Sequence, residues 1–246
     1  MRLKDRTAIV TGGASGFGAG IARVFAREGA SVLVVDRNGD GAARVAAEVG
    51  GRSAEMDVAA DADWARVVAA ALDGWGRIDV LVNNAGITHL PQPMEDVPEA
   101  EFDRVLAVNA KSVYLSARHV VPAMKAAGRG AILNVASTAG VSPRPRLNWY
   151  NASKGWMITA TKAMAVELAR DGIRVNCLNP VAGETPLLSS FMGEDTPEMR
   201  ARFLSTIPLG RFSTPEDMGE AAAFLCSDAA SMITGVGLEV DGGRCI

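Results

Sequence analysis

Several residue types are scarce in this chain, and each scarcity argues against a class of protein. Only two histidines and three cysteines occur among its 246 residues. The cysteines, Cys177, Cys226 and Cys245, are scattered and form no C-x-x-C motif, which predicts a reduced, cytoplasmic protein rather than a disulfide framework. So few histidines and cysteines also offer little for a metal cluster, and we expect no metal site.

Long hydrophobic runs and an excess of positive charge are missing too. No apolar run could cross a bilayer, and the first residues, MRLKDRTAIV, lack the apolar core of a secretion signal. The formal net charge of −3 gives no electrostatic reason to expect nucleic acid. We therefore expect neither membrane nor nucleic-acid partners. With 48% hydrophobic residues, the chain suits one large α/β domain over residues 1–246.

Glycine, by contrast, is concentrated in the segment TGGASGFG at residues 11–18. The apolar run before it suits a buried strand, and Ile21, Val24 and Phe25 after it follow helical spacing. Glycine adopts positive φ and lets another molecule lie against the main chain, while a helix N-terminus attracts phosphate. We expect the diphosphate of a dinucleotide at this turn. The alternative is a tight turn without a ligand.

Strand and helix patterns alternate along the rest of the chain. Strands are expected at residues 7–11, 31–36, 53–57, 78–83, 131–136, 173–178 and 236–240, and helices at 16–28, 40–49, 61–75, 98–127, 149–170 and 215–226. This order predicts a doubly wound Rossmann fold, with a seven-stranded parallel sheet and helices on both faces. The one long irregular stretch, about 180–214, is rich in Pro, Met and Phe, and we expect a substrate lid there.

Asp36 ends the second expected strand, about 20 residues after the glycines, where a dinucleotide fold places an acid. Such a carboxylate accepts hydrogen bonds from the adenosine ribose and repels a 2′-phosphate. Ser15, before Gly16, brings no positive charge, whereas Arg37 could pair with a 2′-phosphate. An ordinary acid at a strand end would also explain Asp36, but the position favours NAD over NADP.

Tyr150 and Lys154 form a Y-x-x-x-K motif and share one face of the helix expected over 149–170. A phenol has a pKa near 10, and lowering it by about three units requires about 4 kcal/mol. A lysine ammonium and a nicotinium ring can together supply this by charge attraction. The motif therefore indicates a general base. The alternative is a tyrosine at the edge of a buried helix beside a solvated lysine.

These features together resemble the single-domain short-chain dehydrogenase/reductase family. The resemblance extends from Arg6 to Gly243 and depends on TGGASGFG, Asp57-Val58, the NNAG of residues 83–86, Asn109, Ser137, the tyrosine–lysine motif and the VDGG of residues 240–243. The loop NPVAGETP and the ending DGGRCI resemble a subgroup of aromatic alcohol and aldehyde dehydrogenases. The resemblance implies an NAD-dependent oxidoreductase that interconverts an alcohol and its aldehyde or ketone. Its substrate would be a small apolar or aromatic alcohol, with or without an anionic group.

The resemblance also implies roles for individual residues. Ser137 would hydrogen-bond the substrate oxygen and Tyr150 would transfer the alcohol proton. Lys154 would lower the pKa of the tyrosine and hold the nicotinamide ribose, and Asn109 would hold a water that links the lysine to solvent. The implied cofactor contacts are Gly12, Ser15, Gly16, Phe17, Gly18, Asp36, Asp57, Val58, Asn83, Ala85, Gly86, Tyr150, Lys154, Pro180 and Thr185.

The substrate contacts are less closely defined. They are expected to come from Ser137, Tyr150, His89, Arg144, Trp149 and Glu184, with further walls from Leu187, Leu188, Phe191 and Met192. Arg144 or Arg146 would meet a carboxylate or sulfonate, unless both are solvated loop charges or subunit contacts. The sequence departs from the family where Val181 replaces the glycine of a proline–glycine pair and Gly183 replaces Ile or Val. Val181 is expected to alter the loop near the nicotinamide.

Two other functions are compatible with these motifs. A 3-oxoacyl thioester reductase would prefer NADPH and an acidic carrier, which Asp36 and Ser15 do not favour. A non-catalytic dinucleotide sensor would have no need of Ser137, Tyr150 and Lys154 together. The segments 98–127 and 149–170 carry more apolar residues than one sheet face needs, and the resemblance implies a homotetramer built through them.

Overall fold

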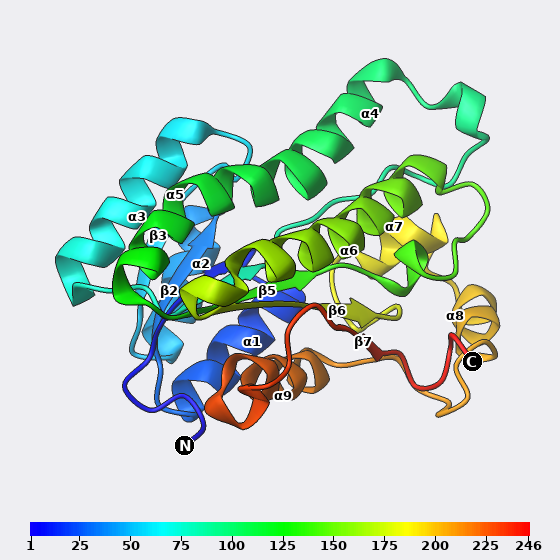
Figure 1. Cartoon of the computed structure of the whole chain (residues 1–246). Helices are drawn as coiled ribbons and strands as arrows, with labels where there is room; N and C mark the ends of the chain where they lie inside the picture. The colour runs from blue at the N-terminus through cyan, green and yellow to red at the C-terminus, as the bar shows by residue number, and fades with distance from the viewer.

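The strands form one parallel sheet that positions every later feature of the molecule. The computed structural model describes all 246 residues, and the sheet order is β3-β2-β1-β4-β5-β6-β7 (Figure 1). The strands are β1 (Thr7–Thr11), β2 (Ser31–Asp36), β3 (Arg52–Glu55), β4 (Val80–Asn83), β5 (Gly130–Val135), β6 (Ile173–Pro180) and β7 (Gly237–Val240). All neighbouring strands are parallel. The order reverses between β1 and β4, so a crevice is expected at their carboxyl ends.

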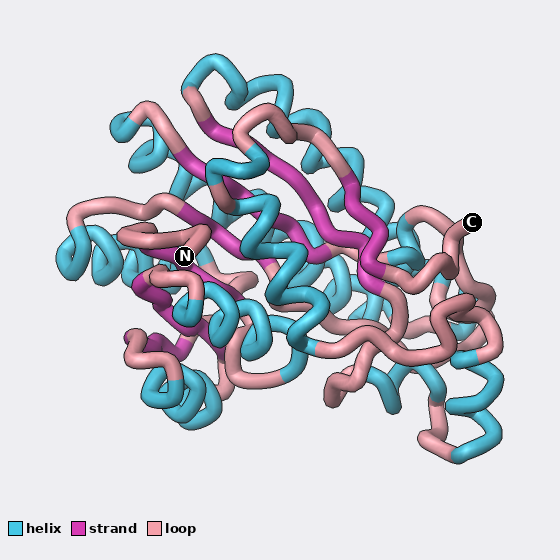
Figure 2. The backbone as a smooth tube through the Cα atoms, turned by 90° about the horizontal axis from the view of Figure 1, so that it is seen from below, coloured by secondary structure: helices cyan, strands magenta, loops and turns pink.

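Helices cover both faces of this sheet, as Figures 1 and 2 show. On one face lie α1 (Gly16–Arg27), α2 (Gly39–Glu48) and α9 (Pro215–Cys226), and on the other lie α3 (Asp61–Trp75), α5 (Ser112–Ala127) and α6 (Asn148–Leu168). Successive strand residues point to opposite faces, so Val10 and Val34 join the first core while Ile9 and Leu33 join the second. The predicted doubly wound fold with a seven-stranded parallel sheet is confirmed.

Two expected elements differ from the structure. The helix expected over 98–127 is α4 (Glu99–Leu106), a π-helical turn (Ala107–Lys111) and α5, because the buried side chain of Asn109 bonds outside the helix at this turn. Residues 180–214 are not irregular throughout, since they contain α7 (Leu188–Met192) and α8 (Pro197–Leu204). The start of α8 carries a recognisable signal, because Thr196 accepts a hydrogen bond from the Met199 amide and Pro197 follows it.

The segment after β6 has a small core of its own. Val181, Leu188, Met192, Ile207 and Phe212 are buried against one another. This cluster stabilises α7 and α8 beside the carboxyl end of the sheet. The three cysteines are free, and no helix is both long and apolar enough to cross a membrane.

Helices α1 and α9 approach each other closely at two glycines. A Cβ atom on Gly20 would lie 2.3 Å from the carbonyl oxygen of Pro215, and one on Gly219 would lie 2.4 Å from Cγ2 of Val24. These distances are far shorter than any carbon contact that packing tolerates. The missing side chains therefore allow the two helices to pack together.

This packing predicts that Gly20→Ala lowers the free energy of unfolding by about 1–2 kcal/mol, because the cost of overpacking exceeds the gain in helix propensity. The control is Gly155→Ala in α6, where the new Cβ would meet only the Gly140 carbonyl oxygen at 3.8 Å. That variant should gain about 0.5–1 kcal/mol. Denaturant unfolding measures both. A Gly20→Ala protein as stable as the parent would contradict the close approach of α1 and α9.

Candidate active site

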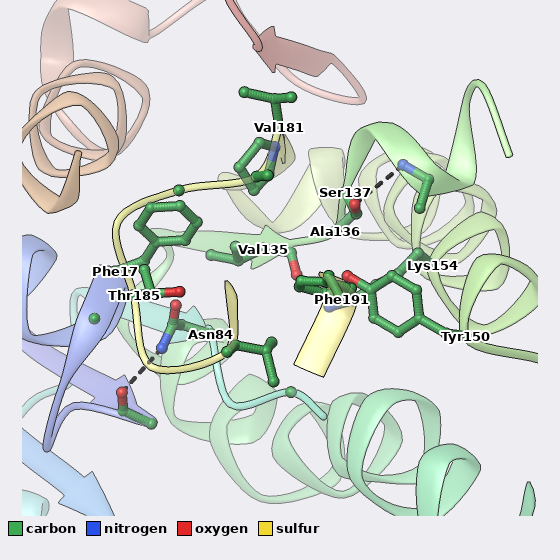
Figure 3. Close-up of a pocket in the computed structure, with 18 of the residues that line it drawn as sticks. Phe17, Asn84, Val135, Ala136, Ser137, Tyr150, Lys154, Val181, Thr185 and Phe191 are labelled. Carbon is green, nitrogen blue, oxygen red and sulfur yellow. Dashed lines mark hydrogen bonds between the residues drawn. The ribbon is translucent and has the colours of Figure 1, made fainter. Parts of the chain in front are cut away.

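A cavity of about 350 Å³ lies where the carboxyl ends of the central strands meet the segment after β6. It is lined by turns that are far apart in the chain but adjacent in the sheet. Of the residues expected at a site, those that line it are Gly12, Ser15, Gly16, Phe17, Asp36, Ala85, Gly86, Ser137, Arg144, Tyr150, Lys154, Pro180, Thr185, Leu187 and Phe191. The structure therefore brings most of the predicted residues into one cavity (Figure 3).

The glycine-rich turn presents the N-terminus of α1 to this cavity. Gly12 and Gly16 have φ angles of 64° and 53°, which residues with a side chain rarely adopt. Ser15 makes no side-chain capping bond, and the first turn of α1 contains no acidic residue. By contrast, Asn38 caps α2, whose first turn contains Asp40. The open N–H groups and the helix dipole of α1 therefore fit a diphosphate.

Asp36 is fixed at the edge of the same turn. Its Oδ2 atom accepts a hydrogen bond from the Ala14 amide at 3.0 Å, and its Oδ1 atom accepts one from the Asn38 amide at 2.9 Å. Arg37 is exposed and does not line the cavity. The Asp36 carboxylate therefore lines the cavity, while the Arg37 guanidinium lies outside it.

Ser137, Tyr150 and Lys154 gather on one side of the cavity, across from Phe17 and Thr185 (Figure 3). Ser137 follows β5, and its Oγ atom accepts a hydrogen bond from the Ala139 amide at 3.0 Å. Tyr150 lies in the first turn of α6 and is only 4% exposed. Lys154 lies one turn later, where its Nζ atom donates to the Val135 carbonyl at 2.8 Å. The end of β5 thus positions both the serine and the lysine.

Burial controls the ionisation of this group. It raises the pKa of Tyr150 to about 12, although hydrogen bonding with Ser137 and the charge of Arg144 act in the opposite direction. Burial also lowers the pKa of Lys154 to about 8. The Lys154 Nζ atom is 5.9 Å from the centroid of the Tyr150 ring. The expected lowering of the tyrosine pKa is therefore not produced by the chain's own groups in this arrangement.

Asn109 is wholly buried on the π-helical turn and does not line the cavity. Its Oδ1 atom accepts a hydrogen bond from the Ile87 amide, and its Nδ2 atom donates to the Ile87 carbonyl, both at 2.9 Å. Nδ2 also donates to Oγ of Ser153 at 3.0 Å. Asn109 therefore ties the loop after β4 to α6, and its role in holding a water stays a prediction.

Three expected substrate contacts lie outside the cavity. His89 is only 1% exposed, and its Nδ1 atom lies 2.9 Å from the Leu90 carbonyl. Trp149 packs edge-on against Phe102 and donates to the Met94 carbonyl. Glu184 is exposed and forms an ion pair with Arg200 at 3.5 Å. Each side chain thus has a local contact, and none of the three lines the cavity that contains Tyr150.

Four expected cofactor contacts also do not line the cavity. Asp57 accepts a hydrogen bond from the Ala59 amide, and Val58 accepts one from the indole of Trp64. Asn83 donates to Asn134 within the sheet. A Cβ on Gly18 would lie 2.1 Å from the Gly12 carbonyl oxygen. Gly18 is therefore needed for the close packing of the turn.

Sequence reasoning missed several cavity residues, among them Asn84 and Phe203. Asn84, not Asn83, faces the cavity, and its amide donates to the Thr11 and Gly12 carbonyls. The alternation of side chains along β4 could have identified it, because neighbouring residues point in opposite directions. Phe203 reaches the cavity from α8, a helix that the sequence pattern did not predict.

The structure also separates the two candidate arginines. Arg144 lines the cavity, and its guanidinium lies 4.4 Å from the centroid of the Phe203 ring. Arg146 is exposed with a φ of 67°, and its carbonyl accepts a hydrogen bond from the Gln92 amide. Of these two arginines, only Arg144 is therefore available to a ligand in the cavity.

The two departures from the family pattern have structural consequences. Val181 is buried in the small core of the segment after β6. A Cβ on Gly183 would lie 2.3 Å from Cζ of Phe17. The Phe17 ring therefore occupies the space that a side chain at position 183 would need. A glycine at this position allows the Phe17 ring to pack there.

Comparison with known proteins adds to this geometry. Residues 12–244 match the family described as Enoyl-(Acyl carrier protein) reductase. The chain is 54% identical to the 4-formylbenzenesulfonate dehydrogenase of Comamonas testosteroni, with 100% of both chains covered. It is 38% identical to a cyclopentanol dehydrogenase of the same species, with 98% of each covered. The first of these relatives belongs to the subgroup that the loop NPVAGETP and the ending DGGRCI resemble.

Solved structures agree with this similarity. A 3-ketoacyl-(acyl-carrier-protein) reductase from Brucella melitensis, complexed with NADH, is 52% identical and has a TM-score of 0.95, covering 99% of this chain and 100% of its own. A levodione reductase is 31% identical with a TM-score of 0.94, covering 99% of each chain. Similarity of this extent covers the whole sheet and all of the cavity.

Proposed function

Because this chain belongs to the short-chain dehydrogenase/reductase family and is an enzyme that acts on alcohols, we propose that it interconverts an aromatic alcohol and its aldehyde with NAD. The observation that carries the proposal is that Ser137, Tyr150 and Lys154 share one cavity with the open N-terminus of α1 and with Asp36. A diphosphate at α1 and a ribose at Asp36 would leave the remaining space to the nicotinamide and the substrate.

The residues of the chain divide the work of the reaction. Ser137 hydrogen-bonds the substrate oxygen as negative charge develops on it. Tyr150 removes the hydroxyl proton in oxidation and returns it in reduction. Lys154, fixed by the Val135 carbonyl, binds the nicotinamide ribose. The nicotinamide, when bound, supplies the hydride acceptor and a positive charge in its oxidised form.

The wall of the cavity supports an aromatic substrate. Phe191 meets the Tyr150 ring at a centroid distance of 5.1 Å, and Leu147 and Phe203 add further apolar surface. Two of these residues come from the segment 180–214, which we propose as the substrate lid of a single domain. The relative at 54% identity is described as acting on an aromatic aldehyde.

A second function is favoured by one observation. The 52%-identical structure from Brucella melitensis is described as a 3-ketoacyl-(acyl-carrier-protein) reductase. A panel containing benzyl alcohols, aliphatic alcohols and a 3-oxoacyl thioester, each assayed with both nicotinamide cofactors, separates the two. The proposal requires turnover of benzyl alcohols with NAD. Turnover confined to the thioester would replace it.

Asp36 generates a prediction of cofactor preference. The parent enzyme should prefer NAD over NADP by at least about tenfold in kcat/KM, because the carboxylate repels a 2′-phosphate. Asp36→Ala should reduce this preference, chiefly by raising kcat/KM with NADP. Steady-state kinetics with both cofactors measure this, and Asp40→Ala in α2, outside the cavity, is the control. Equal efficiency of the parent with both cofactors would remove the assigned role of Asp36.

Tyr150 generates a prediction of mechanism. Tyr150→Phe should lower kcat by about 100- to 10,000-fold, as expected for a lost general base, with little change in NAD affinity. Lys154→Ala should reduce both kcat and the affinity for NAD. Single-turnover hydride transfer and cofactor titration by fluorescence measure them. A Tyr150→Phe enzyme within a few-fold of the parent would exclude this tyrosine as the base.

The pH dependence follows from the same residue. Oxidation needs the phenolate, so its rate should rise with pH through an apparent pKa below the roughly 10 of free tyrosine. In the chain alone burial raises this pKa to about 12, so NAD must lower it. The chain has only two tyrosines. A phenolate difference titration of the parent against Tyr150→Phe therefore isolates this group. An ionisation that NAD does not shift would contradict the account.

We also propose a homotetramer. Tyr114 on α5 and Trp156 and Val166 on α6 are exposed at 55%, 44% and 82%. These helices form the outer layer of one face, where a second copy would bury them. Sedimentation at micromolar concentration should show a tetramer, and Val166→Asp should weaken it. Leu90→Asp, at an exposed loop residue, is the control. A monomeric parent would refute the assembly.

A further inference from the structure

We propose that Arg144 and Arg244 together bind a fixed negative charge on the substrate, and that Arg244, from the C-terminal tail, is a specificity-determining residue. The inference rests on the proposed function and names its substrate class. That class is an aromatic alcohol whose ring carries a sulfonate or a carboxylate. Planar guanidinium groups bind both anions through paired N–H donors.

Arg144 is the arginine inside the cavity, and the chain gives its charge no partner. It is half-buried and its guanidinium forms neither an ion pair nor a hydrogen bond, only the stacking contact with Phe203. Arg174 is a half-buried arginine whose guanidinium does have partners, since it donates to the carbonyl oxygens of Leu225, Ser227 and Ile233. A half-buried guanidinium that faces a cavity without such acceptors is suited to a ligand.

Arg244 has the same property. Its Nε atom is buried and has no hydrogen-bond partner, and its side chain forms no ion pair. The tail around it is well fixed, because Asp241 accepts hydrogen bonds from the amides of Gly243 and Cys245 at 2.9 and 2.8 Å. The Arg244 Nε–H is therefore a buried hydrogen-bond donor, on an ordered backbone, that has no acceptor within the chain.

The two arginines approach the same helix. Arg144 stacks on Phe203, near the end of α8, and the tail packs against the residues that follow α8. A Cβ on Gly242 would lie 2.7 Å from Cγ2 of Ile207, so the contact between the tail and this segment is intimate. Figure 1 likewise shows the C-terminus beside α8. Arg144, which lines the cavity, thus packs against Phe203, while the tail that carries Arg244 packs against Ile207, a few residues later, although Arg244 itself is not part of the cavity wall.

The electrostatics agree with this placement. Burial, and after it the positive charge of Arg244, lower the pKa of Arg144 to about 10. Two like charges without an intervening acid repel one another, and an anion between them removes the repulsion while satisfying the unused donors. Tyr150 lies within range of the Arg144 charge. An aromatic ring beside Phe191 and Phe203 can therefore present its alcohol to Tyr150 and its anion to the arginines.

The test compares benzyl alcohol with 4-(hydroxymethyl)benzenesulfonate and 4-(hydroxymethyl)benzoate, using NAD and the full-length enzyme. The parent should prefer the anionic alcohols in kcat/KM. Arg244→Met and Arg144→Met should each reduce the ratio of anionic to neutral kcat/KM by about 10- to 100-fold, mainly through KM. Arg244→Lys should restore part of the ratio, because it keeps the charge but loses the paired donors. Arg202→Met, at an exposed arginine of α8, is the matched control and should leave the ratio unchanged.

Calorimetric binding of 4-methylbenzenesulfonate, which has no alcohol to oxidise, provides a readout independent of turnover. The parent should bind it more tightly than Arg244→Met does. A parent enzyme that oxidises benzyl alcohol but shows no preference for the anionic alcohols would overturn the inference and leave the proposed function standing. An Arg244→Met ratio equal to that of the parent would remove Arg244 from the site. Failure to oxidise any of the three alcohols would instead refute the proposed function.

Discussion

The ionisation of a buried phenol is the constraint on which the proposed reaction depends. Tyr150 must lose a proton to act as a base, yet burial raises its pKa to about 12. Lys154 does not remove this difficulty alone, because burial lowers its own pKa to about 8 and its ammonium is held by the Val135 carbonyl. We propose that the remaining positive charge comes with the oxidised nicotinamide. In our account, cofactor binding and activation of the base are therefore the same event, and the free protein keeps an inert phenol.

The parallel sheet meets this constraint by collecting distant residues at one edge. The turn after β1 brings the N-terminus of α1, β2 ends at Asp36, and β5 leads directly into Ser137. The reversal of strand order between β1 and β4 opens the space between them. The segment after β6 then closes the cavity with Phe191 and Phe203, using a small core that is separate from those of the sheet. In the proposed function, the sheet therefore supplies the cofactor side of the cavity and the segment after β6 supplies the substrate side.

Much of this was predictable because it depends on local patterns. Strand and helix order follows from hydrophobic periodicity, and Gly12, Gly16, Asp36, Tyr150 and Lys154 belong to short motifs whose spacing reflects one turn or one helix. The fold is accordingly confirmed, and these five residues lie together in the cavity, while their roles toward a cofactor stay predictions.

The substrate half was not predicted to the same extent, because it depends on packing between remote segments. His89 and Trp149 were expected at the cavity, but contacts with Leu90 and with Phe102 hold them elsewhere. Phe203 lies on a helix that is stabilised by its own small core rather than by a clear periodic pattern. The proposed role of Arg244 depends on how the tail packs against the residues that follow α8, and no local motif predicts this packing.

The most direct test of the central claim is to follow hydride transfer itself. The enzyme would be incubated with NAD and a benzyl alcohol that carries deuterium at both positions of its carbinol carbon, and the reduced cofactor analysed by NMR and mass spectrometry. Our account predicts one deuterium at the nicotinamide C4 of each reduced cofactor, on a single face of the ring. Reduced cofactor without deuterium, or aldehyde formed without reduced cofactor, would show that the cavity does not perform the proposed reaction.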